Sequence, residues 1–330
     1  MARCGCSAKP SAFFFVFWAF YLRVQNGLVC MLKIAYSPIY TYPLPPGHRF
    51  PMAKYELVAE QLLYEGTVSE ENFFSPDLLK KETALLAHTE AYWNKLNTLS
   101  LSEREERAIG FPVGERFVLR GRHIAQGTIQ CALFALQHGV AMNVAGGTHH
   151  AYADHGEGYC CFNDQAIAAA YLLRHGLARQ ILIVDLDVHQ GNGTAHIFRH
   201  EPRVFTFSMH GARNYPLRKE RSDLDIDLPD GMEDGPYLAL LRNTLPRLVD
   251  EVQPDFVFYQ SGVDILETDR LGRLRISREG CRQRDRFVLE LCRQHQIPIA
   301  VSMGGGYSPR LSDIVEAHAN TFRTAQEVFF

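Results

Sequence analysis

The sequence lacks the features that mark nucleic-acid-binding and membrane-spanning chains. Its formal net charge is −3, and it contains no basic run with interleaved aromatic residues, so it offers no evident face for a phosphate backbone. Its apolar run at residues 12–22 is eleven residues long, whereas a transmembrane helix needs about 20. We therefore expect no direct contact with nucleic acid and no anchoring in a membrane.

The eight cysteines show neither the spacing of zinc ligands nor the pattern of a disulfide framework. Scattered cysteines of this kind are typical of reduced thiols, which predicts a cytoplasmic protein. No repeat, linker or low-complexity tract divides the chain, and we expect a single domain over residues 31–330. Residues 1–30 are interpreted as an N-terminal extension, either poorly ordered or produced by an upstream start site. A signal peptide is the alternative, although no cleavage site follows the apolar run.

Short apolar runs alternate with helical patterns along the rest of the chain. This alternation predicts a mainly parallel β-sheet with helices on both faces. The expected helices are residues 83–96, 164–175, 237–252 with a kink at Pro246, 278–294 with Ser277 as its cap, and 309–325. The expected strands are residues 32–36, 140–144, 181–184, 204–207, 256–259 and 299–301.

The segment 181–193 carries the clearest chemical signal. Four apolar residues lead directly into Asp185, Asp187 and His189, and two glycines follow. An uninterrupted apolar run is typical of a buried parallel strand, and open α/β sheets bind ligands at the carboxyl ends of such strands. Two buried carboxylates and an imidazole are costly without a cation between them, which favours a divalent metal. A helix N-cap beside a hydrogen-bonded histidine is the alternative reading of this segment.

Three other expected strands end in loops with related chemistry. They are followed in turn by His149-His150, by Asp264, and by a glycine run that ends at Tyr307. Because the carboxyl ends of parallel strands meet at one edge of the sheet, the loops are expected to converge. Each loop also contains glycine, which lets the backbone approach a ligand closely.

Asp187, His189 and Asp264 are the candidate metal ligands. They supply two oxygens and one nitrogen and leave a position open for water, which is typical of catalytic zinc. Iron(II) accepts the same donors. The sequence offers no second cluster of bridging carboxylates beside Asp187, so a binuclear manganese hydrolase is the less favoured class.

The remaining polar residues fit hydrolysis of an amide or ester. His149 and His150 are placed to accept a proton from a metal-polarised water, and Asp185 and Asn192 are the nearest groups by sequence to orient them. Tyr307 is placed to donate a hydrogen bond to a developing oxyanion. A phosphate-binding glycine run is the alternative at that loop, but no lysine follows it. A non-catalytic binding protein would have lost one of these groups, and all are present.

From about Met31 to its C-terminus the chain resembles the histone deacetylase superfamily. The matching motifs are Gly146-Gly-Thr-His-His-Ala151, Gly158-Tyr-Cys-Cys-Phe-Asn-Asp164, Asp185-Leu-Asp-Val-His-Gln-Gly-Asn-Gly193 and Gly304-Gly-Gly-Tyr307. Residues 261–272 are most similar to the class IV branch and its bacterial relatives. The resemblance implies a three-layer α-β-α arginase/deacetylase fold with a mainly parallel sheet of about eight strands.

The resemblance also implies a role for each matched residue, with His150 as the general base and Tyr307 as the tyrosine that polarises the acyl carbonyl. The implied zinc ligands are Asp187, His189 and Asp264. The implied catalytic residues are His149, His150, Tyr307, Asp185 and Asn192. A structural K⁺ or Na⁺ is implied at Asp185 and Ser208. The implied lining of the acyl-lysine tunnel is Gly158, Tyr159, Tyr215, Gly305 and Gly306.

The family implies a zinc-dependent hydrolase that removes acetyl or longer acyl groups from lysine side chains of proteins. A small-molecule amidohydrolase acting on acetylated polyamines shares these motifs, so the expected partner is either an acyl-lysine protein or a small acylated amine. Tyr159 stands where the family has phenylalanine, and its hydroxyl makes the tunnel wall more polar. The sequence makes no prediction of the oligomeric state.

Overall fold

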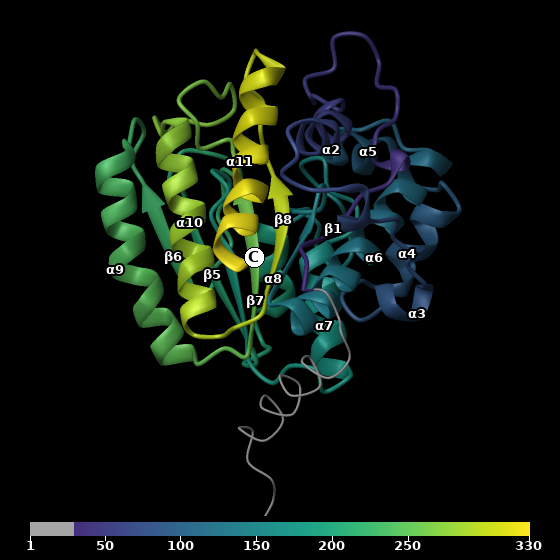
Figure 1. The fold of residues 1–330 in the computed structure, drawn as a ribbon. Helices are drawn as coiled ribbons and strands as arrows, with labels where there is room; N and C mark the ends of the chain where they lie inside the picture. The colour runs from purple at the N-terminus through teal and green to yellow at the C-terminus, as the bar shows by residue number, and fades with distance from the viewer. Residues whose placement is uncertain (1–29) are drawn as a thin grey trace, which may run out of the picture. The chain divides into compact units, whose positions relative to one another are not determined.

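The short apolar runs of the sequence form one sheet in which each strand is parallel to its neighbours. The computed structural model describes residues 30–330. Its strands are β1 Lys33–Ala35, β2 Phe73–Phe74, β3 Val140–Asn143, β4 Ile181–Asp185, β5 Val204–Gly211, β6 Leu224–Leu228, β7 Phe256–Gly262 and β8 Ile299–Gly304. Within these residues the eight strands lie in the order β2-β1-β3-β8-β7-β4-β5-β6 (Figure 1). The predicted parallel sheet is confirmed, and β2 and β6 are additions to it.

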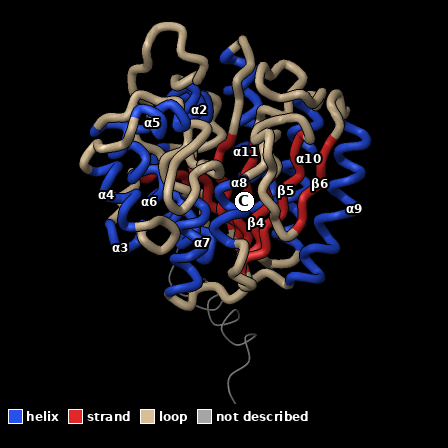
Figure 2. The backbone as a smooth tube through the Cα atoms, turned by 180° about the vertical axis from the view of Figure 1, so that it is seen from behind, coloured by secondary structure: helices blue, strands red, loops and turns tan. Residues whose placement is uncertain are grey.

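Helices cover both faces of the sheet. The helices are α2 Lys54–Tyr64, α3 Lys81–Ala84, α4 Glu90–Asn97, α5 Glu103–Ile109, α6 Glu115–His138, α7 Asp164–Arg174, α8 Asn192–Phe198, α9 Asp234–Val252, α10 Arg278–Gln294 and α11 Leu311–Phe329. On one face α9, α10 and α11 lie side by side, with α2 next to α11 (Figure 1). On the other face lie α6, α7 and α8 (Figure 2). The three-layer α-β-α fold is therefore confirmed.

Several predicted helices are present with small changes at their ends. Ser277 caps α10 as expected, because its hydroxyl accepts a hydrogen bond from the backbone N–H of Gly280. The helix expected over residues 83–96 is wrong as one element. It is divided into α3 and α4, because the Thr89 hydroxyl accepts a hydrogen bond from the Tyr92 N–H and starts a new helix there.

The 24-residue helix α6 was not predicted. Two of its glycines allow it to pack closely against neighbouring segments of the chain. A Cβ atom at Gly121 would lie 2.5 Å from Sγ of Cys161. A Cβ atom at Gly127 would lie 2.7 Å from the Tyr40 hydroxyl oxygen. Glycine lowers helix propensity, and here it permits contacts that any side chain would prevent.

Residues Leu32–Phe330 form one compact unit. The predicted N-terminal extension, residues 1–30, lies outside the described residues except for Cys30. Among residues 30–330 no helix combines the length and the apolar character needed to cross a bilayer.

The strand order brings together the loops that carry the candidate site residues. Strands β3, β8, β7 and β4 are consecutive neighbours in the sheet. Along this row Asn143 pairs with Ser302, Ser302 with Gln260, and Gln260 with Asp185. The loops that follow these strands therefore start at the same level and meet at one edge, as the sequence predicted.

Candidate active site

The structure brings the predicted metal ligands Asp187, His189 and Asp264 together. One ligand atom from each lies within 4.8 Å of the others. Nδ1 of His189 is 3.0 Å from Oδ1 of Asp187 and 3.0 Å from Oδ2 of Asp264. All three residues are buried and lie in the loops that directly follow two adjacent strands, β4 and β7.

Backbone groups hold these carboxylates in place. The N–H of Val188 donates to Oδ1 of Asp264 over 3.0 Å, and the N–H of His189 donates to Oδ1 of Asp187 over 3.0 Å. Gly305 lies opposite Asp264 with φ of +56°, and a Cβ atom there would collide with the Asp264 carboxylate. Glycine is therefore needed at this position for both conformation and space.

The donor set fits a divalent cation. Burial and the neighbouring Asp187 carboxylate raise the pKa of Asp264 to about 7. The Asp187 and Asp264 carboxylates each have an oxygen 3.0 Å from Nδ1 of His189. Two carboxylates that share one neighbour in this way repel each other unless a cation lies between them. Two oxygens and one imidazole nitrogen, without cysteine, suit zinc or iron(II) with an open coordination position.

The His149-His150 pair lies beside the triad, and each ring has a different partner. Nδ1 of His149 is 2.7 Å from Oδ2 of Asp185, and Nδ1 of His150 is 2.6 Å from Oδ1 of Asn192. The two ring centroids are 4.1 Å apart. Since an amide oxygen only accepts hydrogen bonds, Nδ1 of His150 carries the hydrogen and Nε2 is left to accept a proton.

These partners give the two histidines opposite protonation. Burial disfavours the charged form of His149, but the Asp185 carboxylate outweighs it and raises the pKa of His149 to about 9. Burial, together with the charges of His149 and His189, holds the pKa of His150 well below its usual range. His150 is therefore a neutral imidazole at pH 7 and suited to act as a base.

Glu157 orients Asn192 and was not predicted. Nδ2 of Asn192 donates to the Tyr152 hydroxyl over 3.1 Å and to Oε2 of Glu157 over 3.2 Å. The Tyr215 hydroxyl donates to the same Glu157 oxygen over 2.5 Å. These contacts point the amide oxygen of Asn192 at His150. Nothing in the sequence distinguishes Glu157 from a solvent-exposed carboxylate.

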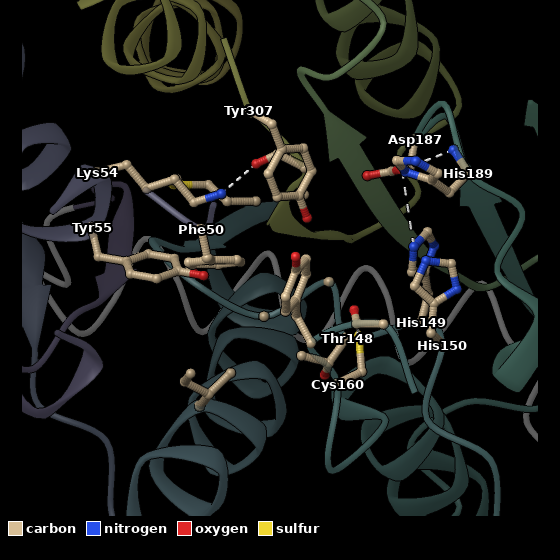
Figure 3. A pocket seen from close by; sticks show the side chains of 18 of the residues that line it. Phe50, Lys54, Tyr55, Thr148, His149, His150, Cys160, Asp187, His189 and Tyr307 are labelled. Atoms are coloured by element: carbon tan, nitrogen blue, oxygen red, sulfur yellow. Dashed lines mark hydrogen bonds and ion pairs between the residues drawn. The ribbon is translucent and has the colours of Figure 1, made fainter. Parts of the chain in front are cut away.

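Tyr307 reaches the same pocket from the loop after β8. Its backbone N–H donates to Oδ2 of Asp269 over 2.6 Å, and its hydroxyl points into the pocket (Figure 3). Burial, with smaller contributions from Asp264 and Asp187, raises the pKa of Tyr307 well above its usual range. The phenol therefore keeps its proton and is available as a hydrogen-bond donor.

The predicted tunnel residues divide into two groups. Gly158, Tyr159 and Gly305 line the pocket beside the triad. Gly306 lies against the side chains around helix α11 instead, and Tyr215 packs with the edge of its ring against His150, at 4.9 Å between centroids. Neither of these two lines the pocket itself.

Sequence reasoning missed the residues at the other end of the pocket. Phe50 forms an aromatic wall with Tyr159 and Tyr307, with ring centroids 5.2 and 6.0 Å away. Lys54 and Arg120 also line the pocket. Nothing in the sequence distinguishes Lys54 or Arg120 from a surface residue.

The predicted monovalent-cation site stays a prediction. Asp185 and Ser208 are paired in register on the adjacent strands β4 and β5. The Ser208 hydroxyl forms a 2.8 Å hydrogen bond with Nδ1 of His210. Both residues are buried.

Comparison with known proteins identifies the family. A model of the histone deacetylase domain matches residues 48–322. The chain belongs to the histone deacetylase family. It is 44% identical over 296 residues to an uncharacterized protein of Picosynechococcus sp., which covers 90% of this chain and 99% of that protein. It is 31% identical over 269 residues to Histone deacetylase 2 of Arabidopsis thaliana, covering 79% of this chain and 70% of that protein.

A solved structure agrees with this fold. The HDA15 HD domain matches this histone deacetylase family chain with a TM-score of 0.76 at 20% sequence identity, covering 90% of this chain and 88% of that one. At that identity the likeness shows the arginase/deacetylase fold. The family resemblance is thus confirmed, whereas the class IV assignment stays a prediction.

Proposed function

We propose that this histone deacetylase family hydrolase is a zinc-dependent deacylase that removes acetyl or longer acyl groups from the ε-amine of lysine. The observation that carries the proposal is the meeting of three kinds of group at one pocket. These are the triad of Asp187, His189 and Asp264, the neutral imidazole of His150, and the hydroxyl of Tyr307. Together they provide a metal site, a base and an oxyanion donor.

Asp187, His189 and Asp264 would hold the zinc. Zinc bound there would supply a Lewis acid that polarises the acyl carbonyl and lowers the pKa of a water molecule. The chain's own residues would perform the proton transfers and stabilise the charge that develops on the carbonyl oxygen.

His150 is the general base in this proposal. Its Nε2 accepts a proton from the attacking water, while its Nδ1–H continues to donate to the Asn192 amide oxygen. The Tyr307 hydroxyl donates a hydrogen bond to the carbonyl oxygen as negative charge develops on it. The carbon–nitrogen bond of the amide then breaks, and the histidine pair returns the proton to the departing lysine amine. The products are a carboxylate and a free ε-amine.

The test uses the full chain loaded with zinc and a fluorogenic acetyl-lysine peptide. His150→Ala should lower kcat by about 10²- to 10⁴-fold, and Tyr307→Phe by about 10²- to 10³-fold. Tyr64→Phe is the matched control, because Tyr64 is 92% exposed. Full activity in either active-site variant would contradict the proposal.

A metal measurement separates binding from catalysis. Asp264→Asn should lower the bound zinc measured after dialysis, because it removes a charged ligand. His150→Ala should keep its zinc while losing activity. Parallel loading with iron(II) shows which metal supports the higher kcat.

A further inference from the structure

Two cationic side chains line the same pocket as Asp187 and His189. They are Lys54, at the start of α2, and Arg120, within α6. Figure 3 shows Lys54 and Tyr55 across the pocket from Asp187 and His189, with Tyr307 and Phe50 between them. The pocket therefore joins the candidate metal centre to a second, positively charged end.

Both cations are buried without a carboxylate partner. Lys54 is 2% exposed and Arg120 is 3% exposed. Among residues 30–330, no carboxylate oxygen lies within 4.0 Å of a side-chain nitrogen of Lys54 or Arg120, the distance that defines an ion pair. A buried charge is costly unless an opposite charge compensates it.

The partners that the two side chains do have are neutral. Lys54 donates to the backbone carbonyl of Gly305, and its Nζ lies 4.6 Å from the ring centroid of Phe50. Nε of Arg120 donates to the carbonyl of Tyr40 over 2.7 Å. An ammonium group has three N–H donors and a guanidinium has five, so donors remain for a ligand.

Both cations also lie against the ring of Tyr55. Nζ of Lys54 is 5.5 Å from the ring centroid of Tyr55, and Cζ of Arg120 is 5.1 Å from the same centroid. Two like charges that share one ring repel each other, and burial lowers the pKa of Lys54 to about 8. An anion between them would remove this repulsion.

The nearest acids do not serve as that anion. The carboxylates that act on Lys54 from a distance are Asp264, Asp269 and Asp187. Asp264 and Asp187 are the candidate metal ligands, and a divalent cation balances their charge. Asp269 already accepts hydrogen bonds from three backbone N–H groups. With the metal bound, the cationic end needs a counter-charge from a ligand.

We propose that Lys54 and Arg120 bind a carboxylate at the far end of the acyl group, so that the preferred substrates are lysines with dicarboxylic acyl groups such as succinyl or glutaryl. This inference rests on the proposed deacylase function and names its substrate class. The acyl carbonyl lies at the triad and Tyr307, and the methylene groups lie along the Phe50 ring. Water adds a hydroxyl to the acyl carbon and a proton to the amine, and the products are a dicarboxylate and lysine.

The experiment compares matched peptides on the zinc-loaded full chain. Succinyl-lysine is paired with butyryl-lysine, and glutaryl-lysine with valeryl-lysine. The two acyl groups of a pair have the same number of carbon atoms and differ only in whether the chain ends in a carboxylate or in a methyl group. We expect kcat/KM to be at least about 10-fold higher for the charged member of a pair. Lys54→Met and Arg120→Met should each abolish this preference, which lowers the ratio by about 10-fold or more.

Two further variants and one pair of inhibitors complete the test. Lys54→Arg should restore the preference, because it keeps the positive charge. Lys80→Met should leave the ratio unchanged, because Lys80 is exposed. A thermal unfolding scan shows that each variant is folded. Succinate should also inhibit more strongly than butyrate, whereas equal inhibition would assign the site to the ordinary carboxylate product and overturn the proposal.

The failure of the inference differs from the failure of the proposed function. If neutral acyl chains are hydrolysed as well as charged ones, and Lys54→Met lowers all rates alike, the deacylase function stands and the dicarboxylic preference is wrong. If no acyl-lysine peptide of any kind is hydrolysed, both are wrong.

Discussion

The Nδ1 atom of His150 lies 2.6 Å from the amide oxygen of Asn192, whereas Nδ1 of the adjacent His149 lies 2.7 Å from the carboxylate of Asp185. One histidine therefore has a neutral partner and the other a charged one. This difference decides which ring is neutral at pH 7, because a carboxylate stabilises imidazolium and an amide does so only weakly.

Asn192→Asp should move the acid limb of the pH profile upward. The new carboxylate stabilises the charged form of His150 and raises its pKa by about one unit or more. The base must be neutral to accept a proton, so its activity is lost at a higher pH than in the parent. The measurement is kcat/KM from pH 5 to 9, with Asn94→Asp on the exposed face of α4 as control. An unshifted acid limb would exclude His150 as the base.

Gly305→Ala should weaken metal binding strongly. A Cβ atom there collides with the Asp264 carboxylate, in addition to the cost of a positive φ. Gly231→Ala is the matched control, because Gly231 has φ of +77° and nothing within 4 Å of its Cβ position. Competition with a chelator should show at least about a 10-fold loss of zinc affinity for Gly305→Ala alone. Equal losses in both variants would mean that backbone strain, and not the ligand contact, is responsible.

Arg284→Met should destabilise the fold by about 3–5 kcal/mol, because it leaves a buried carboxylate unpaired. Arg284 is fully buried, its Nε donates to Asp285 over 2.8 Å, and its Nη1 donates to the carbonyls of Leu186 and Gly262. Urea unfolding measures the free-energy change. Arg282→Met, which removes an exposed ion pair on the same helix, should cost about 1 kcal/mol or less. A similar small cost for Arg284→Met would show that the buried pair is not needed.

Glu65→Gln should reduce stability at pH 7 but not at pH 2. Hydrogen bonds from Arg323, at 2.7 and 2.5 Å, lower the pKa of Glu65 to about 2. A carboxylate with a lowered pKa stabilises the fold above its unfolded pKa, and this stabilisation is lost as pH falls toward the folded value. The two groups are partly exposed, so the difference at pH 7 is about 1 kcal/mol or less.

The check is a series of urea unfolding curves between pH 7 and pH 2 for the parent and Glu65→Gln. The two should converge between about pH 5 and pH 2. Glu82→Gln, at an exposed position of α3, serves as control. A difference that persists unchanged at pH 2 would show that charge is not its cause.

The sequence was sufficient for the parts of the molecule that follow simple periodic rules. Strands β4 and β7 are buried on both faces, so each begins with an unbroken run of apolar residues that is visible in the sequence. Their parallel direction predicts that Asp187, His189 and Asp264 meet at one edge of the sheet. Asn192 was a candidate for orienting the histidine pair because it is near in the sequence, and the family resemblance implied its role as a histidine partner.

The residues that were missed depend on contacts between distant segments. Helix α6 escaped prediction because its polar residues and two glycines weaken the apolar pattern, and only packing against Tyr40 and Cys161 explains those glycines. Strand β6 is a short edge strand with alternating aspartates. Lys54 and Arg120 resemble surface residues until the fold buries them.

The position of β8 in the sheet has a consequence for biosynthesis. This strand lies between β3 and β7, and Ile299 is in register with both Val140 and Val257. Until residues 299–304 have left the ribosome, the two halves of the sheet have no strand to join them. The loop bearing His149-His150 and the loop bearing Asp264 consequently reach their final places only at the end of translation. The triad of Asp187, His189 and Asp264 follows β4 and β7 within one half of the sheet, but His149-His150 follows β3 in the other half. The candidate active site should therefore be completed only after translation, and a nascent chain that ends before residue 299 should lack the proposed activity.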